Sequence, residues 1–366
     1  MSLRETILPR LDGSREWPRG PAGWLWQMLR GLAAPYGGTM RLRAEAYRRG
    51  LLSAWQAPCP VVSVGNLTTG GTGKTPLTLW MASHLQEVGY RVAVVSRGYG
   101  QTSREAVTLV ADGEQVLERP PRAADEAVLL ARRLPGVVVA TGPERRAVIE
   151  ALWRRFAPDV VILDDAFQHL RVRRDLDVVL LDGRRPFGNG RLLPAGLLRE
   201  PPTALSRASL VCLTRLAEGV EVTSWKEKLL QLGYAGEVVA TAHRPAGWQP
   251  LQGGACWPLE ALRGRRVMGF AGLADPTSFR ESLPALGLDV AGFQAFADHH
   301  FWGDAELRQL RERAHSLGAA YLVCTEKDLV KLPADGWEIP VVALRIDVVF
   351  TSEARPLIDA LRRTVG

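Results

Sequence analysis

The chain has 366 residues, of which 46% are hydrophobic and 23% are charged, and its formal net charge is +7. This length and composition predict a folded globular protein with room for two domains, and they exclude an intrinsically disordered chain. The positive charge indicates an anionic partner, which could be a nucleic acid, a lipid head group or a phosphorylated substrate. The sequence has no zinc-finger or RNP aromatic signature, so we expect no nucleic-acid partner.

No targeting or membrane-spanning segment is indicated by the sequence. No uninterrupted apolar run reaches about 18 residues, so we expect no spanning helix. Residues 1 to 20, MSLRETILPRLDGSREWPRG, lack the apolar core of a signal peptide, which predicts that the main body of the protein stays in the cytosol. The four cysteines have no CxxC spacing, so we expect reduced thiols in or near the core rather than disulfides or a zinc site.

The segment after residue 20 has an amphipathic helical pattern. We predict two helical pieces within residues 22 to 53, separated by Pro35 and the pair Gly37-Gly38. The apolar positions are Trp24, Leu25, Met28, Leu29 and Leu32 in the first piece and Met40, Ala44, Tyr47 and Leu51 in the second, with arginines between them. Such a segment either lies in a membrane interface, with its cations on anionic lipid, or packs on the body of the protein. Both interpretations stay open.

From Pro60 onward, short apolar strands alternate with segments of helix length. The expected strands are residues 61–64, 92–95, 137–140, 160–163, 178–181 and 210–213. Because several are apolar on both faces, they belong in a parallel sheet covered by helices. Residues 106–117 carry an Asp-Gly turn between two short strands and are expected to form an inserted hairpin.

A second α/β unit is expected after a junction rich in proline and glycine at residues 244–258. Strands near residues 266–271, 321–324 and 341–346 follow it. The predicted fold is therefore α/β, with a P-loop NTPase-like, mostly parallel sheet and helices on both faces, a smaller second α/β domain and an N-terminal amphipathic segment. The predicted boundaries are 1–55, 56–243 and 244–366.

The stretch VVSVGNLTTGGTGKTP, residues 61 to 76, has the strand, loop and helix order of a phosphate-binding loop. It fits G-x-x-x-x-G-K-[ST] except at the first glycine, where Thr68 stands. The residues expected to bind nucleotide are Thr68, Thr69, Gly70, Gly71, Thr72, Gly73, Lys74 and Thr75. Lys74 would neutralise the β- and γ-phosphate oxygens, and the Thr75 hydroxyl would ligate Mg²⁺. The alternative is a glycine-rich turn with a surface lysine.

Three acidic or histidine-containing clusters are further candidates. Asp164 and Asp165 end an apolar strand and could hold the metal, although the sequence does not say which one does so directly; they could instead cap the next segment. Asp125 and Glu126 open a helical pattern, where carboxylates also occur for ordinary capping reasons. The triplet Asp298-His299-His300 precedes a helix start, where a capping aspartate and two surface histidines would look the same. We assign no chemistry to His84, His243 and His315.

A family resemblance becomes specific when the motifs are taken together. In chain order they are SVGNLTTGGTGKTP, SRGYG, DDAFQHLRVRRDLD, FGNGRLLPAGLLREP, FAGLADPTSF, FADHH and TEKDLVKLP, over most of residues 20 to 333. This combination resembles the tetraacyldisaccharide 4'-kinase family. The chain has Ala166 where that family usually has glycine, and Ala124 and Ala127 where it usually has glycine and proline around the Asp-Glu pair.

The resemblance implies transfer of the γ-phosphoryl group of ATP to the 4'-hydroxyl of tetraacyldisaccharide 1-phosphate, forming lipid IVA, with ATP and Mg²⁺ as cofactors. It implies a cleft between two α/β domains, with Asp125 as general base paired with His299 or His300, Glu126 near the metal, and Lys74 on the phosphates. The expected acceptor contacts are Asn189, Arg199, Glu200 and His169. Arg171, Arg173 and Arg174 either meet the 1-phosphate of the acceptor or form a solvated basic face.

The resemblance also implies a peripheral enzyme on the anionic cytoplasmic face of the bacterial inner membrane, without an obligate protein partner. One rival is a membrane-associated P-loop ATPase switch of the partitioning type, whose loop carries a lysine where this chain has Thr69. Another rival is a soluble small-molecule kinase. Acyl-chain preference, oligomeric state and the extent of domain closure stay open.

Overall fold

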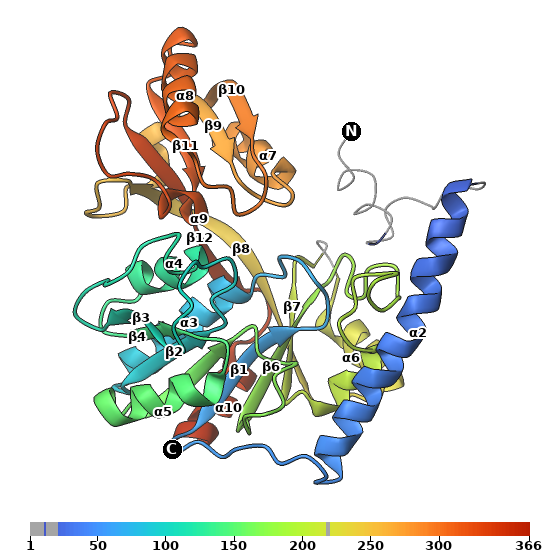
Figure 1. Ribbon diagram of the computed structural model, residues 1–366. Helices are drawn as coiled ribbons and strands as arrows, with labels where there is room; N and C mark the ends of the chain where they lie inside the picture. The colour runs from blue at the N-terminus through green and yellow to red at the C-terminus, as the bar shows by residue number, and fades with distance from the viewer. Residues whose placement is uncertain (1–10, 12–20, 217–219) are drawn as a thin grey trace. The chain divides into compact units, whose positions relative to one another are not determined.

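The computed structural model describes residue 11, residues 21 to 216 and residues 220 to 366 (Figure 1). Residues 1 to 10 and 12 to 20, which include Trp17 and for which no signal peptide was predicted, lie outside the described residues. Two compact units are present. The first unit is Met1–Arg97, Glu144–His243 and Val348–Gly366, and the second unit is Gly98–Pro143 and Arg244–Asp347. Each unit therefore combines separate stretches of chain, whereas the predicted boundaries divide the chain consecutively.

The first unit contains a parallel sheet. Its strand order is β8 (Glu237–Pro250), β7 (Leu210–Thr214), β6 (Leu176–Asp182), β1 (Val61–Asn66), β5 (Val160–Asp164) and β2 (Val92–Ser96), and each neighbouring pair is parallel. Every residue of β1, β2, β5 and β7 is buried, as expected for apolar strands covered on both faces. The covering helices include α3 (Lys74–Glu87), α5 (Arg145–Phe156), α6 (Val222–Gln231) and α10 (Arg355–Val365) (Figure 1). The predicted α/β fold and these strands are confirmed.

The second unit also contains parallel strands. Their order is β10 (Asp289–Ala295), β9 (Arg266–Ala271), β11 (Tyr321–Thr325) and β12 (Val341–Phe350). Its helices are α7 (Thr277–Ala285), α8 (Asp304–Ser316) and the short α9 (Glu326–Leu329). Strands β9, β11 and β12 were predicted. β10 was not, because it is only partly buried along its length and carries a weak apolar pattern.

Residues 98 to 143 add a strand pair and a helix to the second unit. β3 (Thr108–Asp112) pairs antiparallel with β4 (Val138–Thr141), and α4 (Asp125–Arg133) lies between them in sequence. The expected hairpin within 106–117 is reduced to one isolated bridge, Ala111 to Val116, because the main partner of β3 is β4. Residues 137–140 were predicted to lie in the parallel sheet. This prediction was wrong for the pairing of β4 with β3, which is antiparallel.

The junction predicted at residues 244–258 begins where the second unit resumes, at Arg244, but its first residues lie in a strand. β8 continues through it to Pro250. Proline fixes φ near −65°, which an extended strand tolerates where the missing N–H is not required. Trp248 is fully buried, exchanges backbone hydrogen bonds of 2.9 Å with Trp257, and donates from Nε1 to the Leu259 carbonyl at 3.1 Å. Tertiary packing of this tryptophan therefore keeps the segment extended.

The N-terminal segment forms one helix, α2 (Pro21–Arg48), so the prediction of two pieces was wrong. An interior proline costs a helix about 3 kcal/mol, because it removes a hydrogen bond and crowds the preceding turn. Contacts with the first unit offset this cost: Tyr36 donates from its hydroxyl to the Arg199 carbonyl at 2.8 Å, and Arg43 donates to the Gln168 carbonyl at 3.0 Å. Gly37, next to Tyr36 in the helix, is also buried.

Helix α2 also carries exposed apolar residues. Trp24, Met28 and Leu32 are 61%, 52% and 55% exposed, and their spacing of four residues puts them on one face, which we call the α2 stripe. Across the part of the chain that the structure describes, no helix is both long and apolar enough to span a bilayer. Both interpretations of this segment thus have support, since part of the helix packs on the protein and the α2 stripe is exposed.

Candidate active site

The phosphate loop connects the end of β1 to the start of α3. Gly70 and Gly73 have φ values of 117° and 88°, the left-handed region that favours glycine. At Gly73 a side chain is also excluded by space, because a Cβ atom there would lie 2.1 Å from Cε1 of His243. The loop thus ends at the N-terminus of α3, where free backbone N–H groups bind phosphate oxygens.

Polar contacts hold this loop in place. Asn66 donates from Nδ2 to Oγ1 of Thr72 at 2.9 Å, and Thr214 donates from Oγ1 to the Thr72 carbonyl at 3.1 Å. Thr69 donates its N–H to the Leu197 carbonyl at 2.8 Å. Thr68 forms an antiparallel bridge with Leu198, an extended conformation that needs no glycine. This explains how the loop tolerates a threonine in place of the usual first glycine.

Asp165 lies between two cations of the first unit. Lys74 Nζ is 3.5 Å from Oδ1 of Asp165, and an Arg199 guanidinium nitrogen donates to the same oxygen at 2.8 Å. Burial alone raises the pKa of Asp165, but the charges of Lys74 and Arg199 and their hydrogen bonds hold it below its usual range. Asp165 is therefore ionised, and the predicted acceptor residue Arg199 contacts the predicted metal carboxylate.

The donor set at the end of β5 fits Mg²⁺. Asp164 is buried and accepts a hydrogen bond from Oγ1 of Thr78 at 3.0 Å, which orients its carboxylate next to α3. Together with Asp165 and the hydroxyl of Thr75 in the first turn of α3, it provides the oxygen ligands that this cation prefers.

Two of the other predicted acceptor residues, Asn189 and Glu200, make contacts within the protein. Asn189 donates from Nδ2 to the Ala195 carbonyl at 2.9 Å, and the buried Glu200 pairs with Arg207 at 2.8 Å. His169 has a buried Nε2 without a hydrogen-bond partner among the described residues. The basic residues Arg171 and Arg174 pair with Glu144 and Asp177, both at 2.8 Å.

A pocket of about 360 Å³ lies between α2 and the segment around residues 190–202. Its lining includes three arginines and several apolar residues: Arg30, Arg41 and Arg191 with Leu192, Ala195 and Leu198. Arg191 also lies over the ring of Trp26, with 5.5 Å between the guanidinium carbon and the ring centroid. Guanidinium groups beside apolar walls suit an amphiphilic anion.

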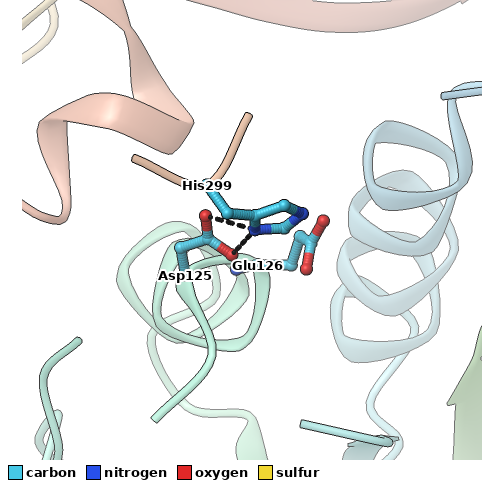
Figure 2. Close-up of side chains that lie close together, drawn as sticks. All are labelled: Asp125, Glu126 and His299. Carbon is cyan, nitrogen blue, oxygen red and sulfur yellow. Dashed lines mark hydrogen bonds and ion pairs between the residues drawn. The ribbon is translucent and has the colours of Figure 1, made fainter. Parts of the chain in front are cut away.

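The second unit brings Asp125 and His299 together. Asp125 opens α4, is 2% exposed, and accepts from the Glu126 N–H at 3.0 Å. Nδ1 of His299 lies 3.0 Å from Oδ2 of Asp125 (Figure 2). The neighbouring His300 instead places Nε2 3.1 Å from Oε1 of Glu306. His299 is therefore the histidine that pairs with Asp125.

The contact between Asp125 and His299 shifts the pKa values of both residues toward their charged forms. Burial raises the pKa of Asp125, but the hydrogen bond from His299 and the charge of Lys327 outweigh it, and the pKa lies below its usual range. The hydrogen bond to Asp125 raises the pKa of His299 against the opposing effects of burial and Lys327. Asp125 is thus an ionised acceptor despite its burial.

Two lysines that were not predicted as site residues surround this pair. Lys327 Nζ is 3.0 Å from Oε1 of Glu126 and 3.2 Å from Nε2 of His299. The side chain of Lys331 is fully buried, with Nζ 3.0 Å from Asp328 and 3.8 Å from Asp125. Both belong to the quoted motif TEKDLVKLP. The rarity of lysine was the available sequence signal, since only five of the 46 Lys and Arg residues are lysines.

The oxygens and nitrogens of Asp125, Glu126 and His299 lie within 4.8 Å of one another, a grouping that could hold a metal ion. However, the ammonium of Lys327 is already within 3.2 Å of two of these three residues. Glu126, expected near a metal, therefore has a lysine as its cationic partner in this structure. The predicted residues form two groups: the loop with Asp164, Asp165 and Arg199 in the first unit, and Asp125, Glu126 and His299 in the second.

Two partly buried histidines of the first unit predict acid sensitivity. Burial, followed by nearby arginines, lowers the pKa of both His169 and His243 to about 4. The unfolded chain, with histidine pKa values of about 6.5, binds more protons between about pH 6.5 and pH 4, so the free energy of unfolding should fall as pH decreases through that window. We expect a loss on the order of 1 to 3 kcal/mol per histidine.

Denaturant unfolding of the nucleotide-free protein at several pH values would measure this loss. His169→Gln and His243→Gln should each make the free energy of unfolding depend less steeply on pH. His315→Gln, at an exposed position of α8, should leave this dependence unchanged. A profile as steep in the double variant as in the wild type would contradict the assignment to these two residues.

Comparisons with known proteins agree over nearly the whole chain. A family model described as tetraacyldisaccharide-1-P 4'-kinase matches residues 25–365. The chain is 43% identical over 325 residues to a tetraacyldisaccharide 4'-kinase of Pelobacter propionicus, which covers 88% of each chain. It is 45% identical over 305 residues to one of Geobacter metallireducens, covering 83% of this chain and 88% of that one. A crystal structure of LpxK from Aquifex aeolicus in complex with ATP is similar with a TM-score of 0.76 and 29% identity, covering 93% of this chain and 99% of that one.

Proposed function

The chain belongs to the tetraacyldisaccharide-1-P 4'-kinase family, and from this premise we propose which of its residues carry the reaction. The enzyme is an ATP-dependent kinase of lipid A biosynthesis that phosphorylates the 4'-hydroxyl of tetraacyldisaccharide 1-phosphate. The observation that carries the residue assignment is the 3.0 Å contact between Asp125 and His299, since a sugar hydroxyl needs a base as its new bond forms.

The first unit binds ATP in this proposal. Backbone N–H groups of the phosphate loop cradle the phosphates at the N-terminus of α3, and Lys74 stabilises the charge that develops on the transferring group. Thr75, Asp164 and Asp165 would hold Mg²⁺, which neutralises charge on the phosphate oxygens when it is bound. The support for Lys74 is its place beside the ionised Asp165, with only a small part of its side chain exposed.

The second unit supplies the base. The acceptor 4'-hydroxyl loses its proton to the Asp125–His299 pair while its oxygen bonds to the γ-phosphorus, and the bond from that phosphorus to the bridging oxygen breaks to release ADP. His299 is 24% exposed and Asp125 is 2% exposed. His299 is therefore the accessible member of the pair, and Asp125 stabilises the positive charge that His299 gains.

A transfer assay tests the function directly. Purified protein is incubated with ATP labelled in its γ-phosphate and tetraacyldisaccharide 1-phosphate in detergent micelles, and we expect label in the lipid. The matched control is an acceptor with hydrogen in place of the 4'-hydroxyl, which should take up no label. Hydrolysis of ATP at the same rate with either acceptor, and no labelled lipid, would instead support a P-loop ATPase switch.

We also propose that the enzyme binds peripherally to the anionic cytoplasmic face of the bacterial inner membrane. The α2 stripe supports this, because exposed tryptophan and aliphatic residues on one helix face insert at the level of the head groups. Arg30 and Arg41 on the same helix are exposed cations that anionic lipid attracts. The arginine-lined pocket beside α2 is our candidate for the phosphate and inner acyl chains of the acceptor.

Removal of the α2 stripe should weaken membrane binding. The triple variant Trp24→Ser, Met28→Ser and Leu32→Ser should bind anionic vesicles at least about 10-fold more weakly, because each buried apolar side chain contributes roughly 1.5 to 3 kcal/mol. It should lose activity on acceptor embedded in vesicles and keep nucleotide binding.

Vesicle sedimentation at low and high salt measures the effect. The matched control is Val88→Ser with Leu230→Ser, which removes exposed apolar residues elsewhere in the first unit. Equal sedimentation of the triple variant and the wild type would indicate that α2 only packs on the protein body. A failure of the wild type to sediment at all would favour a soluble kinase.

A further inference from the structure

We propose that Lys327 is a positioning residue for the Asp125–His299 pair, donating from Nζ to Nε2 of His299 and thereby leaving Nδ1 to carry the hydrogen that Asp125 accepts. This inference rests on the proposed function, in which that pair is the base. It adds a residue of the second unit, and it assigns each ring nitrogen of His299 a separate task.

The contacts place Lys327 at the far end of the imidazole ring from Asp125. Nζ of Lys327 lies 3.2 Å from Nε2 of His299, while Nδ1 lies 3.0 Å from Oδ2 of Asp125. The same ammonium is 3.0 Å from Oε1 of Glu126 and 3.7 Å from Oδ1 of Asp298. Two carboxylates therefore hold the ammonium at this position independently of the histidine.

Hydrogen-bond chemistry then fixes the tautomer. An ammonium group has donors and no acceptor, so the Nε2 atom that faces it must offer its lone pair. A neutral imidazole carries one hydrogen, which must then be on Nδ1, where the ionised Asp125 accepts it. Nε2 thus carries the lone pair, and the ring can take a proton there once the acceptor hydroxyl replaces Lys327 as the hydrogen-bond partner of this nitrogen.

Backbone strain at His299 supports the need for positioning. Its φ of 57° is in the left-handed region, which residues other than glycine rarely adopt and which persists only where surrounding contacts hold it. The ring is held by Asp125 at one nitrogen, by Lys327 at the other, and by the edge-to-face ring of Tyr99 at 5.6 Å. Lys327 is one of these three restraints.

The backbone that carries Lys327 is itself anchored. Thr325 donates from Oγ1 to Oδ2 of Asp328 at 2.7 Å, and the Gly272 N–H donates to the same oxygen at 3.1 Å. Glu326 accepts from Arg133, at the other end of α4 from Asp125, at 2.8 Å. Helix α9 and helix α4 are thus joined by an ion pair at the end of α4 remote from Asp125, so Lys327 has a fixed position from which to donate.

Kinetics of matched variants test whether Lys327 acts through His299. Lys327→Met keeps the length of the side chain and removes its charge and donors, and we expect kcat to fall by roughly 10- to 100-fold with KM for ATP nearly unchanged. Lys327→Arg should recover part of the loss. In a His299→Gln background, Lys327→Met should change kcat by less than about twofold, because the residue it positions is gone. Independent, multiplicative losses would overturn the proposal.

Nitrogen NMR of histidine-labelled protein gives a readout that needs no acceptor. The chain has six histidines, and His299 is assigned by the loss of its signals in His299→Gln. At about pH 9, where an ordinary histidine is neutral and an ordinary lysine is charged, we expect hydrogen on Nδ1 and a hydrogen-bonded lone pair on Nε2. In Lys327→Met the Nε2 signal should move toward the position of a free, unbonded ring nitrogen.

The control for the NMR experiment is Glu306→Gln, which should shift the signals of His300 and leave those of His299 in place. A hydrogen on Nε2 in the wild type, or an Nε2 signal unmoved by Lys327→Met, would refute the positioning role. If the NMR shift occurs but no lipid is phosphorylated, the contact stands and the proposed function fails. If lipid is phosphorylated and Lys327→Met alters neither readout, this inference alone fails.

Discussion

Lys74→Met should lower the rate of phosphoryl transfer by about 10²- to 10³-fold, the usual loss when one group that stabilises developing charge is removed. The side chain contacts Asp165 rather than filling the apolar core, so the folded structure should survive. Arg199 remains within 2.8 Å of Asp165 and keeps that carboxylate paired in the variant. The measurements are single-turnover transfer and thermal unfolding of the same preparation.

The matched control for Lys74 is Lys226→Met, which removes a lysine of α6 whose partner is Glu237 at 3.3 Å. It should transfer phosphate at the wild-type rate. Near-normal transfer by Lys74→Met would refute the assignment of the phosphate loop as the γ-phosphate site. A large fall in unfolding temperature would instead mean that the lost activity reflects lost structure.

Asp125→Asn and His299→Gln should each reduce kcat by about 10²- to 10⁴-fold, with little change in ATP affinity, because a base acts mainly in the transition state. Asn at position 125 keeps the shape of the buried side chain and removes the charge that stabilises protonated His299. If the two residues act as one unit, the double variant should be little worse than the poorer single variant.

Steady-state kinetics with a direct nucleotide-binding measurement would test this non-additivity. His300→Gln is the internal control, because His300 pairs with Glu306 and not with Asp125. Losses that multiply in the double variant would show that Asp125 and His299 work separately. Equal damage from His300→Gln would show that the DHH segment matters as a structural unit and not through its first histidine.

The phosphate loop could be identified from the sequence because its conformation depends on near neighbours. A buried strand, left-handed glycines, a Lys-Thr pair and a helix start follow one another within residues 61 to 87. The same holds for β1, β2, β5 and β7, whose continuous apolar composition is enough to predict strands buried on both faces. Family resemblance, carried by short motifs, added the reaction.

Local rules failed where distant contacts outweighed them. Pro35 and the glycines after it predicted a break in α2, yet Tyr36 and Arg43 bind carbonyls of the first unit and the helix continues. Prolines and glycines predicted a junction at residues 244 to 258, yet the strand continues to Pro250, where burial of Trp248 keeps the chain extended. In both cases a local preference of a few kcal/mol was smaller than the packing energy of the folded protein.

The detailed geometry of the base was decided only by the tertiary structure. Asp125 and His299 are 174 residues apart, and His299 and Lys327 are 28 residues apart. Two adjacent histidines cannot be told apart in the sequence. The left-handed backbone at His299 and the hydrogen bond between His300 and Glu306 decide which of them contacts Asp125. Sheet register and the packing of α4 against α9 bring these side chains together, and such long-range contacts leave no local pattern in the residues on either side of them.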